Sequence, residues 1–204
     1  TGYAPNSGEA LVGANALNFD SNGNLILCQM GDRRVSIIKN FPTFNPVFET
    51  LVDNYRGKRL NSPNDIIISR DGFYYFSDPA FGFLNLDTFQ IVDSEHREID
   101  FHGIYKFNPT NKDLFLVTNE VSVPNGLALS LDQKFLYIKK MGVFDNSPKV
   151  LKLNLETKKI STLFDGRKIS EEYGGDFDGL KVHSRGHIFF SGGGGIFLRQ
   201  SDGN

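Results

Sequence analysis

The chain has 204 residues, a formal net charge of −2 and 23% charged residues, which is enough length for one normal hydrophobic core. The near-neutral charge and the lack of a basic stripe argue against nucleic acid as the main partner. No run of 18 apolar residues occurs, so the sequence predicts no membrane-spanning helix.

Composition favours an all-β protein. Nineteen phenylalanines, seven tyrosines and 21 glycines suit a domain of many strands and turns, and Lys168–Tyr173 is the single helix candidate. Cys28, inside an apolar stretch, is predicted to be a buried inert thiol with no disulfide partner. The basic pairs Arg33-Arg34 and Lys139-Lys140 are predicted to be solvated residues at loops or strand ends.

The chain divides into four strand-rich segments, here called blades, and the first covers about residues 10–52. Residues 1–9 are predicted to be loop, and a strand is expected over Glu9–Gly13. Later strands are predicted over Val35–Lys39 and Val47–Val52, separated by prolines that interrupt the chain.

The second predicted blade covers residues 61–118. It opens with the polar elbow at 62–65, and Ile66–Ile68 and Phe73–Phe76 then form a hairpin around Arg70-Asp71-Gly72. The connection Gly82–Asp100 is long and polar, which is typical of a functional or mobile segment. Two strands, Phe101–Asn108 and Leu114–Thr118, complete the blade.

The third and fourth predicted blades cover 121–165 and 174–204. The third has a loop at Met141–Pro148 before a strand over Lys149–Leu155. The fourth contains Gly192–Gly195, which is predicted to be a blade turn. That run lacks the lysine, the Ser/Thr and the following helix that a phosphate-binding loop requires.

These blades share an internal repeat. With one polar residue as position zero, four segments align without gaps over about fifteen residues. They are NALNFDSNGNLILCQ from Asn15, NDIIISRDGFYYFSD from Asn64, NGLALSLDQKFLYIK from Asn125 and DGLKVHSRGHIFFSG from Asp178. The spacings of 49, 61 and 53 residues are typical of a β-propeller. A β-sandwich whose hairpins resemble one another by chance is the alternative.

The repeat predicts one propeller domain over residues 1–204. Four blades that do not close on themselves would expose unpaired strands at both ends. The sequence is therefore interpreted as an incomplete propeller, a piece of a larger ring.

The position-zero residues form a candidate site. If each begins the strand nearest the propeller axis, their side chains share one central space. Three carboxamides and one carboxylate are hard oxygen ligands, which best match calcium. The simpler alternative is that these Asx residues cap turns through their own side chains. Asp65 and Asp78, outside position zero, are predicted to be structural caps.

The motifs carry a family resemblance. LNSPNDIIISRDGFYYFSDPAFG, VPNGLALSLDQKFLYI and DGLKVHSRGHIFFSGGGGIF closely resemble blades of the senescence-marker-protein/gluconolactonase family, and NGNLILCQMGDRRV resembles a further blade. The resemblance covers nearly the whole chain and implies a six-bladed propeller with calcium in its central tunnel. Measured against that pattern, the first and last blades are absent.

The resemblance also implies residue roles. Asn125 and Asp178 match the family's metal ligands, Asp178 also matches the general base, and Asn64 matches a residue that meets the substrate or the metal. Asn15 joins Asn64 as a substrate-contact candidate. Three positions depart from the pattern: the first-blade glutamate has no counterpart, since Glu9 lacks its context, and Phe177 and His183 replace a proline and an aspartate.

The resulting hypothesis is a calcium-dependent hydrolase that opens a sugar lactone, with zinc, manganese or magnesium as substitute ions. The expected partner is a small-molecule lactone, and neither nucleic acid nor membrane is expected. Two alternatives stay open, a phosphotriesterase of the diisopropylfluorophosphatase type and a non-catalytic ligand-binding propeller. A cytoplasmic location is favoured, with a secreted or periplasmic one if an N-terminal segment precedes the chain. The oligomeric state stays open.

Overall fold

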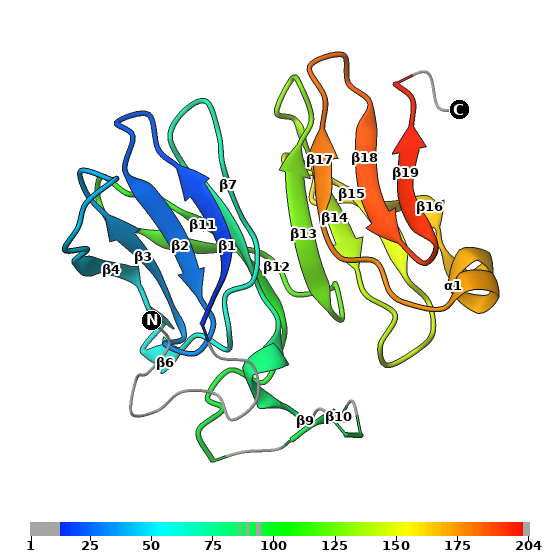
Figure 1. Ribbon diagram of the computed structural model, residues 1–204, viewed down its shortest axis with the longest axis horizontal. Helices are drawn as coiled ribbons and strands as arrows, with labels where there is room; N and C mark the ends of the chain where they lie inside the picture. The colour runs from blue at the N-terminus through cyan, green and yellow to red at the C-terminus, as the bar shows by residue number, and fades with distance from the viewer. Residues whose placement is uncertain (1–12, 86, 89, 93–94, 202–204) are drawn as a thin grey trace. The chain divides into compact units, whose positions relative to one another are not determined.

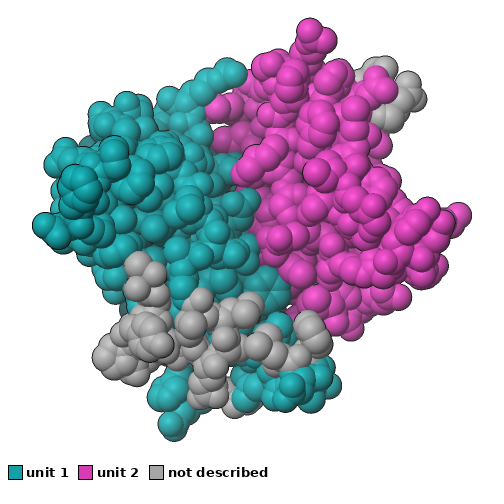
Figure 2. Space-filling view, viewed as in Figure 1, with its two compact units in different colours: residues 1–120 teal, residues 121–204 magenta. Residues whose placement is uncertain are grey.

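The computed structural model describes residues 13–85, 87–88, 90–92 and 95–201. Two compact units divide the chain, unit 1 (residues 1–120) and unit 2 (residues 121–204), coloured separately in Figure 2. Each unit is considered by itself below. Three predictions fall wholly or partly outside the described residues. They are the loop over 1–9, most of the strand over Glu9–Gly13, with Glu9 itself, and the last three residues of the fourth predicted blade.

Blade 1, in unit 1, is a four-stranded antiparallel sheet in chain order (Figure 1). Its strands are β1 (Ala14–Phe19), β2 (Leu25–Gln29), β3 (Arg34–Ile38) and β4 (Phe48–Val52). All five residues of β2 are buried, whereas all six residues of β1 are half-buried or exposed. Strand β2 is therefore covered on both faces, which explains its continuous run of apolar residues.

Blade 2, also in unit 1, is a second four-stranded antiparallel sheet. Its strands are β7 (Ile66–Ile68), β8 (Tyr74–Asp78), β11 (Gly103–Phe107) and β12 (Leu114–Thr118). Short elements occupy the connections. They are the β5–β6 hairpin (Asn54–Tyr55 and Lys58–Arg59), the 3₁₀ helix η1 (Ala80–Phe83) and the β9–β10 pair (Leu84–Asn85 and Gln90–Ile91). The predicted connection over Gly82–Asp100 thus contains short structured elements of its own.

Unit 2 contains blade 3 and blade 4. Blade 3 consists of β13 (Pro124–Leu129), β14 (Phe135–Lys140), β15 (Lys149–Asn154) and β16 (Ile160–Asp165). Blade 4 consists of β17 (Leu180–Val182), β18 (Ile188–Gly192) and β19 (Gly195–Arg199). The short helix α1 (Arg167–Tyr173) joins them at the predicted helix position, and Gly192 pairs with Gly195 across the β18–β19 turn, as predicted.

Successive blades pack together inside each unit. In unit 1, β1 contacts β7, and in unit 2, β13 contacts β17 (Figure 1). The unit 1 core draws on both of its blades, with Ile26 and Val35 from one and Phe76 and Phe107 from the other. First strands side by side and a core between neighbouring sheets are the packing of propeller blades. The predicted fold class, an all-β β-propeller with four blades in this chain, is confirmed.

The repeated hairpin turns follow the sequence closely. The turn residue of each copy, at position eight counted from the position-zero residue, has a positive φ: 78° at Gly23, 84° at Gly72, 56° at Gln133 and 85° at Gly186. Glycine adopts this left-handed conformation without steric cost, and Gln133 shows that the turn geometry is kept where glycine is replaced.

Two of the basic residues predicted to be solvated are buried instead. The Arg33 side chain donates to the carbonyls of Leu60 and His96 at 2.7 Å each, and its guanidinium lies 5.0 Å from the Phe83 ring centroid. Lys139 is also fully buried. Both predictions are wrong because distant backbone carbonyls and aromatic rings replace water around each cation. Cys28, by contrast, is buried as predicted, and burial raises the pKa of its thiol well above the usual value.

Within the described ranges, no helix has the length and apolar character needed to cross a membrane.

Candidate functional site

In unit 1, the structure places Asn15 and Asn64 next to each other. The Asn15 Nδ2 donates to the Asn64 carbonyl oxygen at 3.2 Å, and Asn18 Nδ2 donates in the same way to the carbonyl oxygen of Ile66 at 3.2 Å. These two side chains link β1 to the start of β7. The repeat therefore identified neighbouring residues in space, although Asn15 is exposed and Asn64 is buried.

Asn64 carries an unsatisfied buried atom. Its side chain is 3% exposed, and among the described residues its Oδ1 has no hydrogen-bond partner. Its backbone N–H donates to the Ser77 carbonyl oxygen at 2.8 Å, so the residue is held by its main chain rather than by its carboxamide. A buried carbonyl oxygen without a partner costs free energy unless a ligand, water or ion meets it.

Asp78 holds the elbow that precedes Asn64. Its two carboxylate oxygens accept the backbone N–H groups of Asn61 at 2.9 Å and Ser62 at 2.7 Å. The carboxyl is fully buried, and this burial raises its pKa to about 7, while the two N–H groups and the nearby guanidinium of Arg33 act to lower it. Asp78 is therefore a structural cap, as predicted.

This buried carboxyl predicts a pH-dependent stability. The folded protein keeps the Asp78 proton up to about pH 7, whereas an unfolded aspartate loses it near pH 4. The contribution of Asp78 to stability is therefore greatest below about pH 4 and falls as the pH rises towards 7. We expect the free energy of unfolding to drop between pH 5 and 8 by about 2.6 kcal/mol more in the wild type than in Asp78→Asn.

Urea unfolding at both pH values measures that difference. Asp113→Asn, at an exposed aspartate of the same blade, serves as the control and should keep the wild-type pH dependence. Identical pH dependence in the wild type and Asp78→Asn would show that Asp78 titrates normally in the folded protein.

In unit 2, Asn125 and Asp178 are neighbours. The Gly126 N–H donates to the Asp178 carbonyl oxygen at 3.2 Å. A Cβ atom at position 126 would lie only 2.7 Å from that oxygen, so only glycine permits this approach of the backbones. Glycine after Asn125 is thus what allows the two predicted site residues to meet.

The side chains of this pair differ in exposure. Asn125 is 5% exposed and its Nδ2 donates to Met141 Sδ at 3.0 Å, which turns the carboxamide nitrogen towards the sulfur. Asp178 is exposed, and in the part of the chain that the structure describes its carboxylate forms no hydrogen bond or ion pair. The pair therefore combines a fixed carboxamide with a carboxylate open to solvent.

Two local features of the backbone orient the position-zero residues. In β1 and β13, the strand register shifts by one residue at Asn15 and Asn125, as in a β-bulge, which redirects a side chain. In blades 2 and 4, a serine lies thirteen residues after the position-zero residue, and its hydroxyl accepts backbone N–H groups. Ser77 Oγ accepts from Asp65 at 3.1 Å. Ser191 Oγ accepts from Asp178 at 3.2 Å and from Gly179 at 3.1 Å. Serine at that offset in copies two and four was a readable signal that the motif analysis missed.

The candidate residues fit a hard cation by donor type. Asn64, Asn125 and Asp178 offer two carboxamides and one carboxylate, and the buried Asn64 Oδ1 is unpartnered among the described residues. Calcium accepts such oxygen donors. In the described residues, His, Cys, Asp and Glu side chains form no group of three or more suited to a metal ion. Asn15 and Asn64 belong to unit 1, and Asn125 and Asp178 to unit 2, so each pair is characterised within its own unit.

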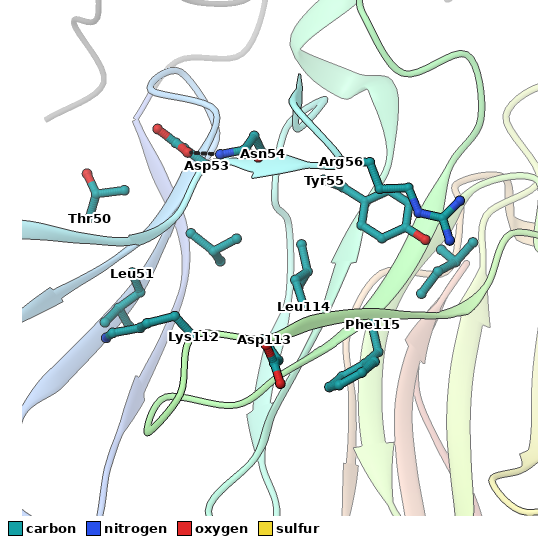
Figure 3. Close-up of a pocket in the computed structure, with 12 residues that line it drawn as sticks. Thr50, Leu51, Asp53, Asn54, Tyr55, Arg56, Lys112, Asp113, Leu114 and Phe115 are labelled. Atoms are coloured by element: carbon teal, nitrogen blue, oxygen red, sulfur yellow. Dashed lines mark hydrogen bonds between the residues drawn. The ribbon is translucent and has the colours of Figure 1, made fainter.

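A pocket in unit 1 lies elsewhere. It has a volume of about 550 Å³ and is lined by the edge strands β4 and β12 and by the β5–β6 hairpin (Figure 3). The Arg56 guanidinium lies 5.1 Å from the Tyr55 ring centroid at one side, and Lys112 and Asp113 lie at the other. None of the candidate site residues lines it.

Comparison with known proteins supplies a family match. The family model described as the SMP-30/gluconolactonase/LRE-like region matches residues 4–204. A gluconolactonase from Zymomonas mobilis is 32% identical over 197 residues, which cover 94% of this chain and 52% of the relative. The chain thus spans about half the length of the curated relative it matches.

Solved structures give the same likeness. A gluconolactonase from Xanthomonas campestris has a TM-score of 0.74 and 27% identity, over 94% of this chain and 60% of that chain. A luciferin-regenerating enzyme, at a TM-score of 0.64 and 18% identity over 95% of this chain and 60% of that chain, shows likeness of fold alone.

Proposed function

The chain belongs to the SMP-30/gluconolactonase/LRE-like family, and from this premise we propose that it acts in the calcium-dependent opening of a sugar lactone. The observation that carries the proposal is the buried Asn64 Oδ1, which no described residue satisfies. This oxygen belongs to the motif set that also contains Asn125 and Asp178. The names of the two gluconolactonases suggest the substrate class, a small cyclic ester of a sugar acid.

Three residues are proposed as calcium ligands on motif and donor type, Asn64 in unit 1 and Asn125 and Asp178 in unit 2. Asn64, Asn125 and Asp178 would each offer a side-chain oxygen, and the hydrogen bond from Asn125 Nδ2 to Met141 keeps that carboxamide in one orientation. When bound, calcium would polarise the lactone carbonyl and stabilise the negative charge that develops on its oxygen.

Asp178 is proposed to act as the general base. Its carboxylate is exposed and is not occupied by a hydrogen bond or ion pair among the described residues, so it can accept a proton from the attacking water. Its backbone is held at both ends of the residue, by the bonds to Ser191 Oγ and from Gly126 N–H. A fixed main chain with an unoccupied carboxylate suits a group that must accept a proton at one place.

Asn64 and Asn15 are proposed to contact the substrate. Neutral carboxamides can orient the lactone's ring oxygen and hydroxyl groups without adding charge. Because Asn15 Nδ2 already donates to the Asn64 carbonyl, we assign the proposed contact between Asn15 and the substrate to Asn15 Oδ1.

Calcium binding provides a direct test of the ligand set. We expect calcium to raise the free energy of unfolding by about 2.7 kcal/mol at a hundredfold excess over its Kd. Asn64→Ala should lose this increment yet match the wild type without calcium, since it deletes an oxygen that no described residue satisfies. Thermal unfolding with and without calcium measures both effects.

Asn22→Ala, at an exposed asparagine in the β1–β2 turn, is the control and should respond to calcium like the wild type. A calcium increment retained in full by Asn64→Ala would remove Asn64 from the proposed ligands.

A further inference from the structure

Unit 2 contains a lysine where a charged side chain is least expected. Lys139, in β14, has 0% of its surface exposed, and lysine is almost never fully buried unless it is paired. In the described residues, no carboxylate lies within ion-pair distance of its ammonium. A buried cation without a direct counter-ion has a cost, so its surroundings indicate what it does.

The ammonium contacts the segment that carries Asp178. Its Nζ donates to the Ser191 carbonyl oxygen at 2.7 Å and lies 3.8 Å from the centroid of the Phe177 ring. Phe177 immediately precedes Asp178 in the chain. Lys139 of blade 3 therefore holds two parts of blade 4, the end of β18 and the residue before the proposed base.

Ser191 continues this connection to Asp178. Its Oγ accepts the N–H groups of Asp178 and Gly179, at 3.2 and 3.1 Å, and its own N–H donates to the Gly179 carbonyl at 3.1 Å. Ser191 thus links the lysine ammonium to the backbone of the proposed base, through its carbonyl on one side and its Oγ on the other. A change in the position of Ser191 would be transmitted to both N–H groups.

The electrostatics agree with this connection. Burial lowers the pKa of Lys139 to about 7, and the charges of Asp176 and Asp178 act in the opposite direction, raising it. Asp176 and Asp178 lie on either side of Phe177 in the chain, and the Lys139 ammonium lies over the ring of Phe177.

We propose that Lys139 is a positioning residue for Asp178, which it holds in place through Ser191 and Phe177. Its importance for catalysis rests on the lactonase function proposed above, whereas its effect on the Asp178 backbone does not. The repeat gives a parallel case: Asp78 occupies the same position, fourteen residues after Asn64, and it holds the elbow before Asn64 through two backbone N–H groups.

Lys139→Met tests the proposal, because methionine has a similar length but no charge and no N–H donor. Hydrogen exchange, followed by NMR, should show the N–H groups of Asp178 and Gly179 exchanging about tenfold faster, by analogy with the loss of a supporting hydrogen bond. The kcat for gluconolactone should fall about tenfold with KM unchanged. The thermal midpoint should change little, because removing the desolvated charge offsets the loss of its hydrogen bond and ring contact.

Lys152→Met is the matched control. Lys152 lies on the same sheet with its ammonium 3.9 Å from the Phe135 ring centroid, so it repeats the lysine–aromatic contact away from Asp178. It should leave exchange and kcat unchanged. Ser191→Ala removes the Oγ acceptor while keeping the lysine, and it should accelerate exchange of the same two N–H groups even if Lys139→Met does not fold.

Hydrogen exchange tests the positioning role of Lys139, and lactone hydrolysis tests the proposed function. Exchange rates within twofold of the wild type in Lys139→Met, or in Ser191→Ala, would overturn the positioning role. Faster exchange in a protein whose wild type hydrolyses no lactone would support the positioning role and refute the proposed function.

Discussion

Replacing Asp178 by asparagine is expected to lower kcat for lactone hydrolysis by about a thousandfold, within the range that a positioned general base contributes. Asparagine keeps the shape of the side chain but cannot accept the proton of the attacking water at neutral pH. The backbone groups of Asp178 make the described hydrogen bonds to Ser191 and from Gly126. The variant should therefore fold with the wild-type free energy of unfolding.

Steady-state kinetics and urea unfolding of Asp178→Asn measure these two quantities. Glu171→Gln is a suitable control, since it makes the same chemical change at an exposed position in α1 and should alter neither. Activity of Asp178→Asn within tenfold of the wild type would exclude Asp178 as the base and would favour a non-catalytic, ligand-binding propeller.

Replacing Phe177 by alanine is expected to lower the free energy of unfolding by about 4 kcal/mol. Its side chain is fully buried, with its ring centroid about 6 Å from those of Phe164, Phe190 and Phe197. The ring also occupies a slot formed by two glycines: a Cβ atom at Gly166 or Gly192 would lie 2.0 or 2.4 Å from it. Alanine would leave this slot empty and would remove the aromatic face beneath the Lys139 ammonium.

Urea unfolding of Phe177→Ala gives the change in stability. Phe189→Ala provides the control from the same blade, because Phe189 is 39% exposed on β18, and it should cost about 1 kcal/mol or less. A cost of that same size for Phe177→Ala would mean that the slot closes after truncation and that the ring does not support blade 4.

The strands and turns could be predicted because their causes are local. Ile66–Ile68 and Leu114–Thr118 are strands at the predicted residues, since their β-branched and aliphatic side chains suit a pleated, half-buried surface. The positive φ at position eight in every copy follows from a tight turn between two strands. The fold class followed from the repetition of this local pattern, which a β-sandwich would not require.

The buried cations could not be predicted because their partners are distant in the sequence. Arg33 is satisfied by carbonyls 27 and 63 residues away, and Lys139 by a carbonyl 52 residues away. A basic pair in the sequence looks the same whether water or a carbonyl surrounds it. The β5–β6 hairpin escaped prediction for a different reason, since each of its strands has only two residues.

The repeat predicted the four candidate residues and one central space shared by their side chains, and that shared space stays a prediction. Two pairs of these residues lie close together within their units: Asn15 donates to the Asn64 carbonyl, and Gly126, which follows Asn125, donates to the Asp178 carbonyl. What the motifs could not give was the support from strand register and distant contacts: the bulges at Asn15 and Asn125, and the contacts of Lys139. These features depend on strand register and on contacts between blades, which emerge only in the folded chain.

The most direct test of the proposed function is gluconolactone hydrolysis measured with calcium and again with a chelator. Calcium-dependent opening of a sugar lactone requires hydrolysis with the ion, loss of the activity in chelator and its return when calcium is restored. Equal rates in calcium and in chelator, or no hydrolysis in either, would contradict it.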